Sequence, residues 1–289
     1  MPKNTQTNHT MQLRTSHGVL DLTKPVVMGI LNLTTDSFYP ESRVKDDNHL
    51  IQVTASMIEQ GAVILDLGGM STRPGSEPVD ESTEMNRLLY ALNIIRNAFP
   101  HIILSVDTWR KAVAEQAVLA GADIINDISA AQFDSGILEV AAAHNLPYVL
   151  MHMQGTPANM QHKPTYQDVV ADVADFFSMQ IERLRHAGIE QIILDPGFGF
   201  GKTTAHNYQL LHALSIYRSQ FHYPILAGIS RKKMVQNPTN INVDEAMHAT
   251  TAAQTLAVLN GVSILRVHDV KPAVDLINIV DFYKNVNDL

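Results

Sequence analysis

The sequence predicts a parallel (β/α)8 barrel, and two observations support this fold class. Short apolar runs alternate with helical patterns from residue 26 to the end of the chain, and glycines stand where four of those helices should end. Alternation of this kind is typical of a parallel sheet with helical crossovers. Glycine is favoured just after a helix because it adopts a left-handed conformation without strain; the four are Gly61, Gly121, Gly188 and Gly261. An open doubly wound sheet is the alternative, although it usually needs fewer strands.

Eight apolar runs are expected to form the strands of the barrel. They cover residues 26–31, 63–67, 102–106, 124–126, 147–151, 192–194, 225–228 and 263–267. The helices expected between them include residues 50–60, 81–98, 110–120, 166–187 and 244–260.

The N-terminal part of the chain is expected to lie outside the barrel strands. Residues 1–10 are polar and predict a disordered tail, whereas residues 11–22 predict a short β-hairpin that turns at His17-Gly18. No internal repeat or low-complexity linker interrupts the remaining pattern. We therefore expect residues 11–289 to form one domain.

Composition excludes several classes of protein. The 289 residues are 45% hydrophobic and 17% charged, as in an ordinary soluble enzyme, and the net charge of -8 argues against a large nucleic-acid surface. Cysteine is absent, which excludes disulfides and thiolate metal sites. No apolar run approaches the roughly 18 residues of a membrane span, and the first ten residues lack the apolar core of a signal peptide. We expect a cytoplasmic protein with no membrane or nucleic-acid partner.

Every predicted strand ends in a polar or ionisable group. In a barrel of this kind the active site lies where the strands end and the helices begin. The groups at these junctions are Asn32, Asp66, Asp107, Asn126, His152, Asp195, Arg231 with Lys232, and Arg266 with His268. Any one of them could be a helix cap or a structural hydrogen bond, but the set of eight predicts a site.

These groups divide by charge. Asp107, Asn126 and Asp195 supply acceptors and an amide suited to a planar heterocycle with ring N–H and amino donors. Arg266 and His268 are two residues apart on one strand and therefore point to the same face. Together with Arg73 from a neighbouring loop they are suited to an anion, because arginine binds phosphate through two parallel hydrogen bonds.

Three glycine-rich or polar loops follow strands. Residues 194–202 contain Asp195, three glycines and two aromatics, which suggests a floor for a flat polar ligand; a tight turn with an aspartate cap is the alternative. Residues 34–45 and 68–75 could close over a ligand and expel water, or could be surface connections only.

Eight motifs taken together resemble the dihydropteroate synthase family. They are VMGILNLTTDSF, GGMSTRPG, SVDT, GADIINDIS, LMHMQGTP, LDPGFGFGK, ISRK and RVHDV, in the family's order between residues 26 and 274. The resemblance implies a (β/α)8 barrel that joins 6-hydroxymethyl-7,8-dihydropterin diphosphate to p-aminobenzoate, with Mg2+, in folate biosynthesis. It also implies a homodimer and competition by sulfonamides for the p-aminobenzoate subsite.

The resemblance implies roles for individual residues. The residues implied to bind the pterin are Asp107, Asn126, Asp195 and Lys232. Those implied to hold the diphosphate are Arg73, Arg266 and His268, with Asn32 in contact with Mg2+ and the diphosphate. Those implied to line the p-aminobenzoate subsite are Thr72, Pro74 and Phe200.

The expected chemistry needs no covalent intermediate with the protein. Cations and Mg2+ stabilise the diphosphate as it leaves, and carboxylates favour positive charge on the pterin methylene before the arylamine attacks, in an SN1-like substitution. The residues expected to contribute to catalysis are Arg73, Asp107, Asp195, Lys232, Arg266 and His268.

The chain departs from the family pattern at four places. Thr35 replaces a proline, residues 40–42 read PES where Asp-Gly-Gly is usual, and Met70 replaces an acidic residue. Lys233 stands where the SRKS motif has its final serine. We expect the Lys233 ammonium to help bind the p-aminobenzoate carboxylate; if it points to solvent instead, backbone N–H groups would bind this carboxylate.

Two other functions fit part of the pattern. A corrinoid-linked methyltransferase that binds methyltetrahydrofolate would use a similar barrel, but its substrate has no diphosphate and does not need Arg73, Arg266 and His268 together. A non-catalytic homologue that binds a pterin is favoured only by the altered first loop and Lys233.

Overall fold

The structure is a computed structural model that describes residues 11–33, 43–70, 79–160 and 162–286. Eight parallel strands lie in the order β8-β7-β6-β5-β4-β3-β10-β9. A parallel bridge between Leu194 and Ile225 and a 2.9 Å hydrogen bond from the Leu194 N–H to the Pro224 carbonyl join the two ends. The sheet is therefore a nearly closed barrel, as predicted, and not an open sheet.

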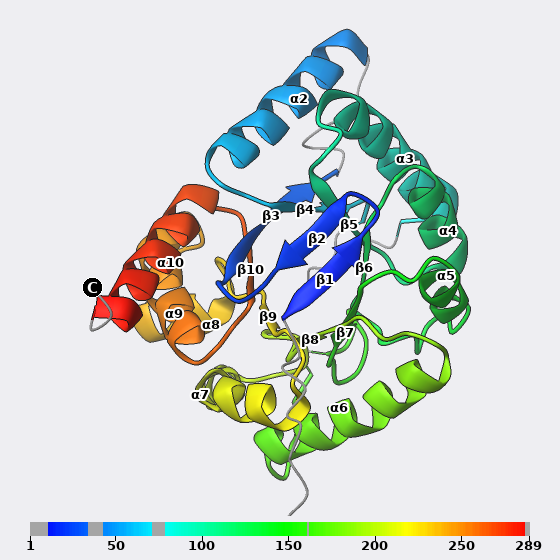
Figure 1. The fold of residues 1–289 in the computed structure, drawn as a ribbon. Coiled ribbons are helices and arrows are strands. Elements are labelled where there is room, and N and C mark those ends of the chain that lie inside the picture. The colour runs from blue at the N-terminus through cyan, green and yellow to red at the C-terminus, as the bar shows by residue number, and fades with distance from the viewer. Residues whose placement is uncertain (1–10, 34–42, 71–78, 161, 287–289) are drawn as a thin grey trace, which may run out of the picture.

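The strands alternate with helices that surround them (Figure 1). The strands are β3 (Val26–Asn32), β4 (Ile64–Gly68), β5 (Ile103–Asp107), β6 (Ile124–Asp127), β7 (Tyr148–Met151), β8 (Ile192–Asp195), β9 (Leu226–Ala227) and β10 (Ile264–Val267). The helices are α2 (Arg43–Glu59), α3 (Glu81–Ala98), α4 (Lys111–Leu119), α5 (Ile137–Ala143), α6 (Val169–His186), α7 (Thr204–Phe221), α8 (Lys233–Thr239), α9 (Met247–Leu259) and α10 (Val270–Asn285).

The bounds of one helix and one strand differ from those predicted. Helix α6 begins at Val169 rather than at residue 166, because the Asp168 side chain caps the N–H groups of Val170 and Ala171. Strand β9 has only two residues, fewer than the four predicted. The four glycines predicted to end helices all have positive φ, between 86° and 103°, and these helix ends are confirmed.

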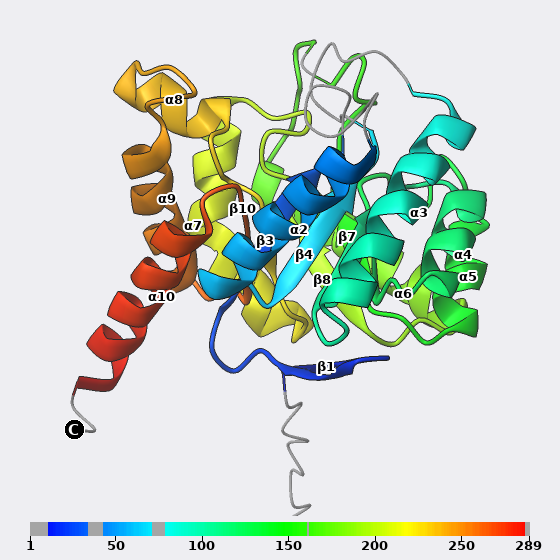
Figure 2. The same cartoon turned by 90° about the horizontal axis from the view of Figure 1, so that it is seen from above.

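The predicted hairpin closes one end of the barrel. Strands β1 (Gln12–Thr15) and β2 (Gly18–Asp21) pair antiparallel and lie across this end (Figure 2). Leu13, Leu20 and Leu22 are buried against a layer of apolar side chains, one from each barrel strand. This layer consists of Met28, Ile64, Ile103, Ile124, Val149, Ile193, Leu226 and Ile264. The hairpin therefore shields the lower core of the barrel from water.

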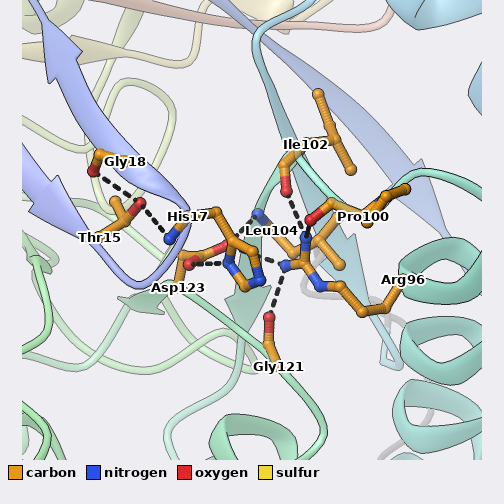
Figure 3. Close-up of polar contacts among 9 residues, drawn as sticks. All are labelled: Thr15, His17, Gly18, Arg96, Pro100, Ile102, Leu104, Gly121 and Asp123. Carbon is orange, nitrogen blue, oxygen red and sulfur yellow. Dashed lines mark hydrogen bonds and ion pairs between the residues drawn. The ribbon is translucent and has the colours of Figure 1, made fainter.

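A buried carboxylate fastens the hairpin to the barrel (Figure 3). Asp123 is fully buried, and its Oδ1 lies 2.7 Å from Nδ1 of His17 in the hairpin turn. Its Oδ2 accepts hydrogen bonds from Nη2 of Arg96, at 2.9 Å, and from the Leu104 N–H, at 3.0 Å. One carboxylate therefore connects the hairpin, α3 and β5.

Among residues 11–33, 43–70, 79–160 and 162–286, no helix is both long and apolar enough to cross a membrane. The expected cytoplasmic location stays a prediction.

We expect Asp123→Ala to lower the free energy of unfolding by about 3 kcal/mol, because it leaves a partly buried guanidinium and a buried N–H group without their acceptor. Urea denaturation measures this change. Asp281→Ala, which removes an exposed ion pair with Lys24, is the matched control and should cost less than about 0.5 kcal/mol. Equal losses in the two variants would contradict the role given to Asp123.

Candidate active site

The polar residues predicted from the strand ends form the inner layer above the apolar one. Side chains alternate between the two faces of a strand, so the residue two positions after an inward apolar residue also points inward. Asp66 follows Ile64, Asn126 follows Ile124, and Arg266 follows Ile264 in this way. The apolar core and the polar layer are therefore consecutive inward positions of the same strands.

Asp66 is the centre of a buried hydrogen-bond network. Its side chain is fully buried and accepts from the Ser105 hydroxyl at 2.6 Å, from Nδ2 of Asn126 at 3.1 Å and from Nε of Arg266 at 2.6 Å. The network holds the Asn126 amide and the Arg266 guanidinium in fixed orientations. Four strands, β4, β5, β6 and β10, contribute to it.

Arg266 also binds a second carboxylate. Its Nη2 donates to Oδ2 of Asp107 at 3.1 Å, so one guanidinium lies between two aspartates. Burial raises the pKa of Asp107 to about 7; Arg266 opposes this shift and the negative charge of Asp66 adds to it. Asp107 can therefore gain or lose a proton near neutral pH according to what lies beside it.

Asp195 and Lys232 form a second group on the β8 and β9 side of the mouth. Oδ1 of Asp195 accepts from the Gly197 N–H at 2.7 Å. Burial raises the pKa of Asp195, while Lys232 and this N–H oppose the shift. Burial lowers the pKa of Lys232 to about 8, and the nearby Asp195 opposes that change. Each of the two groups therefore favours the charged form of the other.

The loop after β8 brings an aromatic ring to the Lys232 ammonium. Nζ of Lys232 donates to the Phe198 carbonyl and lies 4.6 Å from the centroid of the Phe200 ring. A cation over a ring face is attracted by the ring's quadrupole. Phe200, Lys232 and Asp195 thus form one wall of the mouth.

The same loop packs directly on the loop after β7. A Cβ added to Gly197, whose φ is +69°, would lie 1.9 Å from the His152 carbonyl oxygen. A Cβ added to Gly201 would lie 2.4 Å from the Gln154 carbonyl oxygen. Only glycine allows this approach, so residues 194–202 contain a tight turn that Asp195 caps through the Gly197 N–H. The expected role of this loop as a floor for a flat ligand stays a prediction.

The other predicted residues lie at several distinct places. Asn32 is the last residue of β3 and is half-buried. Nδ1 of His268, just after β10, lies 3.0 Å from the Ser230 hydroxyl. Arg231 donates to both carboxylate oxygens of Asp269, at 2.9 and 2.8 Å, and Lys233 is exposed at the first residue of α8.

Part of the predicted site lies outside the described residues. This part is Thr72, Arg73 and Pro74, whose expected roles in binding the anion and the second substrate stay predictions. Thr35 and residues 40–42, where the chain departs from the family pattern, also lie outside the described residues.

Sequence reasoning assigned no role in the site to four buried polar residues around it. The sequence indicates Asp66 and His152 only as strand ends, and Ser105 and Lys202 only as members of the motifs SVDT and LDPGFGFGK. Ser105 had a usable signal, because it lies two residues before Asp107 and so shares its inward face. The contacts of Lys202 with the loop after β7 had no local signal.

The described residues contain no group of three or more histidine, cysteine, aspartate or glutamate side chains that could hold a metal ion. The layer instead combines carboxylates, an amide and cations around the mouth. Such a set can bind a flat molecule rich in N–H groups on one side and an anion on the other.

The comparisons with known proteins agree with this chemistry. The model of a family described as pterin binding enzyme matches residues 28–268. A dihydropteroate synthase from Escherichia coli (strain K12) is 42% identical over 264 residues, which cover 91% of this chain and 93% of that protein.

Two solved structures have the same fold. The Yersinia pestis dihydropteroate synthase in a sulfonamide drug complex is 43% identical to this chain, with a TM-score of 0.88. The match covers 96% of this chain and 100% of that one. The Xanthomonas albilineans dihydropteroate synthase with 4-aminobenzoic acid is 36% identical, with a TM-score of 0.87, over 95% of this chain and 98% of that one.

We expect Gly197→Ala to destabilise the protein by about 3 kcal/mol or more, because its Cβ would overlap the His152 carbonyl. Gly188→Ala is the matched control: its φ is also positive, at +86°, but its Cβ meets only the Cβ of Ala142, at 3.8 Å. Backbone strain alone should cost it about 1–2 kcal/mol. Urea denaturation compares the two, and equal losses would show that the contact between the two loops costs nothing.

Proposed function

Since this chain belongs to the dihydropteroate synthase family, we propose that it joins 6-hydroxymethyl-7,8-dihydropterin diphosphate to p-aminobenzoate. The products are 7,8-dihydropteroate and pyrophosphate, so the protein is a transferase of folate biosynthesis. The observation that supports this best is the inner polar layer, in which Asp107, Asn126, Asp195 and Arg266 all come from family motifs and line one mouth.

We assign the pterin to the acceptors of this layer. The ring N–H and amino groups of a pterin are donors, and Asp107, Asn126 and Asp195 offer oxygen atoms that are buried and held by neighbours. Lys232, which lies near Asp195, supplies a donor for the pterin's acceptor atoms. Because Asp66 fixes Asn126 and Arg266 before substrate arrives, little ordering is needed on binding.

The diphosphate is assigned to the cations and to Mg2+. Arg266, His268 and Arg73 would hold its oxygens, and the Asn32 side-chain oxygen is a suitable hard ligand at the strand end. A single amide fits this ion, because Mg2+ commonly takes one or two protein ligands and completes its shell with substrate phosphates and water. When bound, Mg2+ neutralises charge that develops on the leaving diphosphate.

The substitution needs positioning and charge stabilisation rather than a nucleophile from the protein. The carboxylates of Asp107 and Asp195 favour positive charge on the dihydropterin as the diphosphate leaves, in an SN1-like step. The p-aminobenzoate ring would lie against Phe200, with Thr72 and Pro74 from the loop after β4, so that its amine reaches the pterin methylene. No covalent enzyme intermediate forms.

We also infer that residues 11–289 form one domain and that two copies associate. Exposed apolar side chains gather on two neighbouring helices, α9 and α10, which pack on each other. They are Leu256, Leu259, Ile279, Phe282 and Tyr283, each at least 42% exposed. Burial of such a surface in a symmetric pair would remove it from water.

Pyrophosphate release on mixing both substrates with Mg2+ tests the activity. We expect the wild-type protein to release it and to form dihydropteroate, which neither a methyltransferase nor a non-catalytic homologue would do. Arg266→Ala and Asp195→Asn should each lower kcat/KM by about 100-fold or more, because each removes charge stabilisation at the reacting groups. No release by the folded wild-type protein, or an enzyme-linked pterin trapped on denaturation, would contradict the proposed reaction.

Lys233 is expected to bind the carboxylate of p-aminobenzoate, since it is exposed at the start of α8 and directly follows Lys232. Lys233→Ser should raise the KM for p-aminobenzoate severalfold and change sulfonamide inhibition, with the KM for the pterin substrate unaltered. Steady-state kinetics with each substrate varied in turn measures this. If both constants and the inhibition stay as in wild type, backbone N–H groups bind the carboxylate.

Introducing a negative charge on the exposed apolar surface of α9 and α10 tests whether two copies associate through it. Ile279→Glu on α10 should convert a dimer into a monomer in sedimentation velocity, because a carboxylate at a buried apolar contact is costly. Met179→Glu, which places the same charge at a 63% exposed apolar residue of α6, should leave the dimer intact. A wild-type protein that sediments as a monomer would rule out the association.

A further inference from the structure

Lys202 is a buried cation that the proposed reaction does not use. Its side chain belongs to a residue that is only 4% exposed, behind the loop after β8. Its Nζ has four acceptors: Nδ1 of His152 at 2.9 Å and the carbonyl oxygens of Gly197, Phe200 and His152 at 2.9, 3.0 and 3.2 Å. Burial lowers the pKa of Lys202 to about 7, with the nearby Asp195 opposing the shift, so below that pH these acceptors hold a charged ammonium.

The two loop carbonyls belong to opposite ends of one turn. The Phe200 N–H donates to the Gly197 carbonyl at 3.1 Å, and Lys202 binds that carbonyl together with the carbonyl of Phe200. The next carbonyl, that of Gly201, accepts from the Tyr166 hydroxyl at 2.8 Å. The turn that presents the Phe200 ring is thus held from the interior side.

Two lysines hold this turn from opposite sides. Lys232 binds the Phe198 carbonyl and faces the Phe200 ring at the mouth, whereas Lys202 binds the Gly197 and Phe200 carbonyls from within. The first contacts the proposed pterin subsite. The contacts of the second that the structure shows are with backbone carbonyls and with His152.

His152 completes the interior contact as a neutral acceptor. An ammonium can only donate, so the Nδ1 atom that faces it must be unprotonated and the proton must reside on Nε2. The His152 residue is 7% exposed and its ring meets the edge of Phe176, with centroids 4.9 Å apart. Burial and the neighbouring Lys202 lower the pKa of His152 to about 2, so the ring stays neutral at all working pH values.

We infer that Lys202 and His152 are positioning residues that hold the 197–200 turn so that Phe200 forms the wall of the p-aminobenzoate subsite, an inference that rests on the proposed function. Without the Lys202 ammonium, the turn loses a group that joins both of its ends to the loop after β7. The Phe200 ring would then move relative to Lys232, and the arylamine would be held less precisely.

The Lys202 ammonium also acts on Asp195 through space. Lys232 after β9, Lys202 after β8 and Arg266 on β10 are the cations that face this carboxylate, and each lowers its pKa. Removal of the Lys202 charge should therefore raise the pKa of Asp195. This consequence separates a positioning role from a general loss of structure.

The test uses Lys202→Met, which keeps the unbranched side chain up to the position of Cε but has no donor or charge. We expect the KM for p-aminobenzoate to rise about tenfold or more and the KM for the pterin substrate to change less than about threefold. The acid limb of the kcat/KM profile should move to higher pH. Lys24→Met, at a 48% exposed lysine between β2 and β3, is the control and should match wild type.

Loss of kcat in proportion to the folded fraction, with both KM values and the acid limb unchanged, would overturn the inference. If Lys202→Met does not fold, His152→Asn and His152→Leu take its place. The asparagine oxygen can replace the Nδ1 acceptor and should preserve the KM for p-aminobenzoate, whereas leucine should raise it. Equal KM values in the two variants would overturn the inference.

A readout without turnover keeps this inference distinct from the proposed function. In 15N NMR of the substrate-free protein at pH 6, where the Lys202 ammonium is charged, Nδ1 of His152 should be unprotonated and Nε2 protonated. A protonated Nδ1 would overturn the contact with Lys202 whether or not the protein forms dihydropteroate. Absence of dihydropteroate with the expected NMR signal would instead reject the activity and leave the contact intact.

Discussion

The ion pair between Arg266 and Asp66 determines the arrangement of the barrel mouth. A guanidinium and a carboxylate inside a barrel are stable only as partners, because an unpaired charge there would lose its hydration without compensation. Asp66 also accepts from Ser105 and Asn126, and Arg266 extends to Asp107. The pair therefore aligns side chains from four strands before any ligand binds, and a precise polar site depends on that prior order.

The strand period of two joins this site to the core. In β4, β6 and β10 the inward position nearer the hairpin is apolar and the next inward position is Asp66, Asn126 or Arg266. The hairpin closes the apolar end through Asp123, so water is kept from the lower layer while the upper layer stays open to substrate. On each of these strands one inward residue contributes to the apolar core and the next contributes to the polar site. A shift of a strand relative to its neighbours would therefore disturb both stability and binding.

The glycine-rich loop after β8 is held in one conformation by contacts with side chains from other parts of the chain. Three glycines would leave residues 197–201 flexible in isolation. In the structure each of the carbonyls of Gly197, Phe198 and Phe200 is bound by a lysine. Lys202 therefore holds this short turn from the interior and Lys232 holds it from the mouth. Both lysines also lower the pKa of Asp195.

The sequence alone determined the fold class, the strand ends and most of the residues in the polar layer, because these depend on local period and on the motifs around each strand. It could not show that Asp66 is the centre of the network or that Lys202 faces His152, since both facts join segments far apart in the chain. It also could not give the short length of β9 or the start of α6, where a bridge and a cap decide the boundary. Closure of the barrel brings these segments within hydrogen-bond distance, and only the tertiary structure supplies that closure.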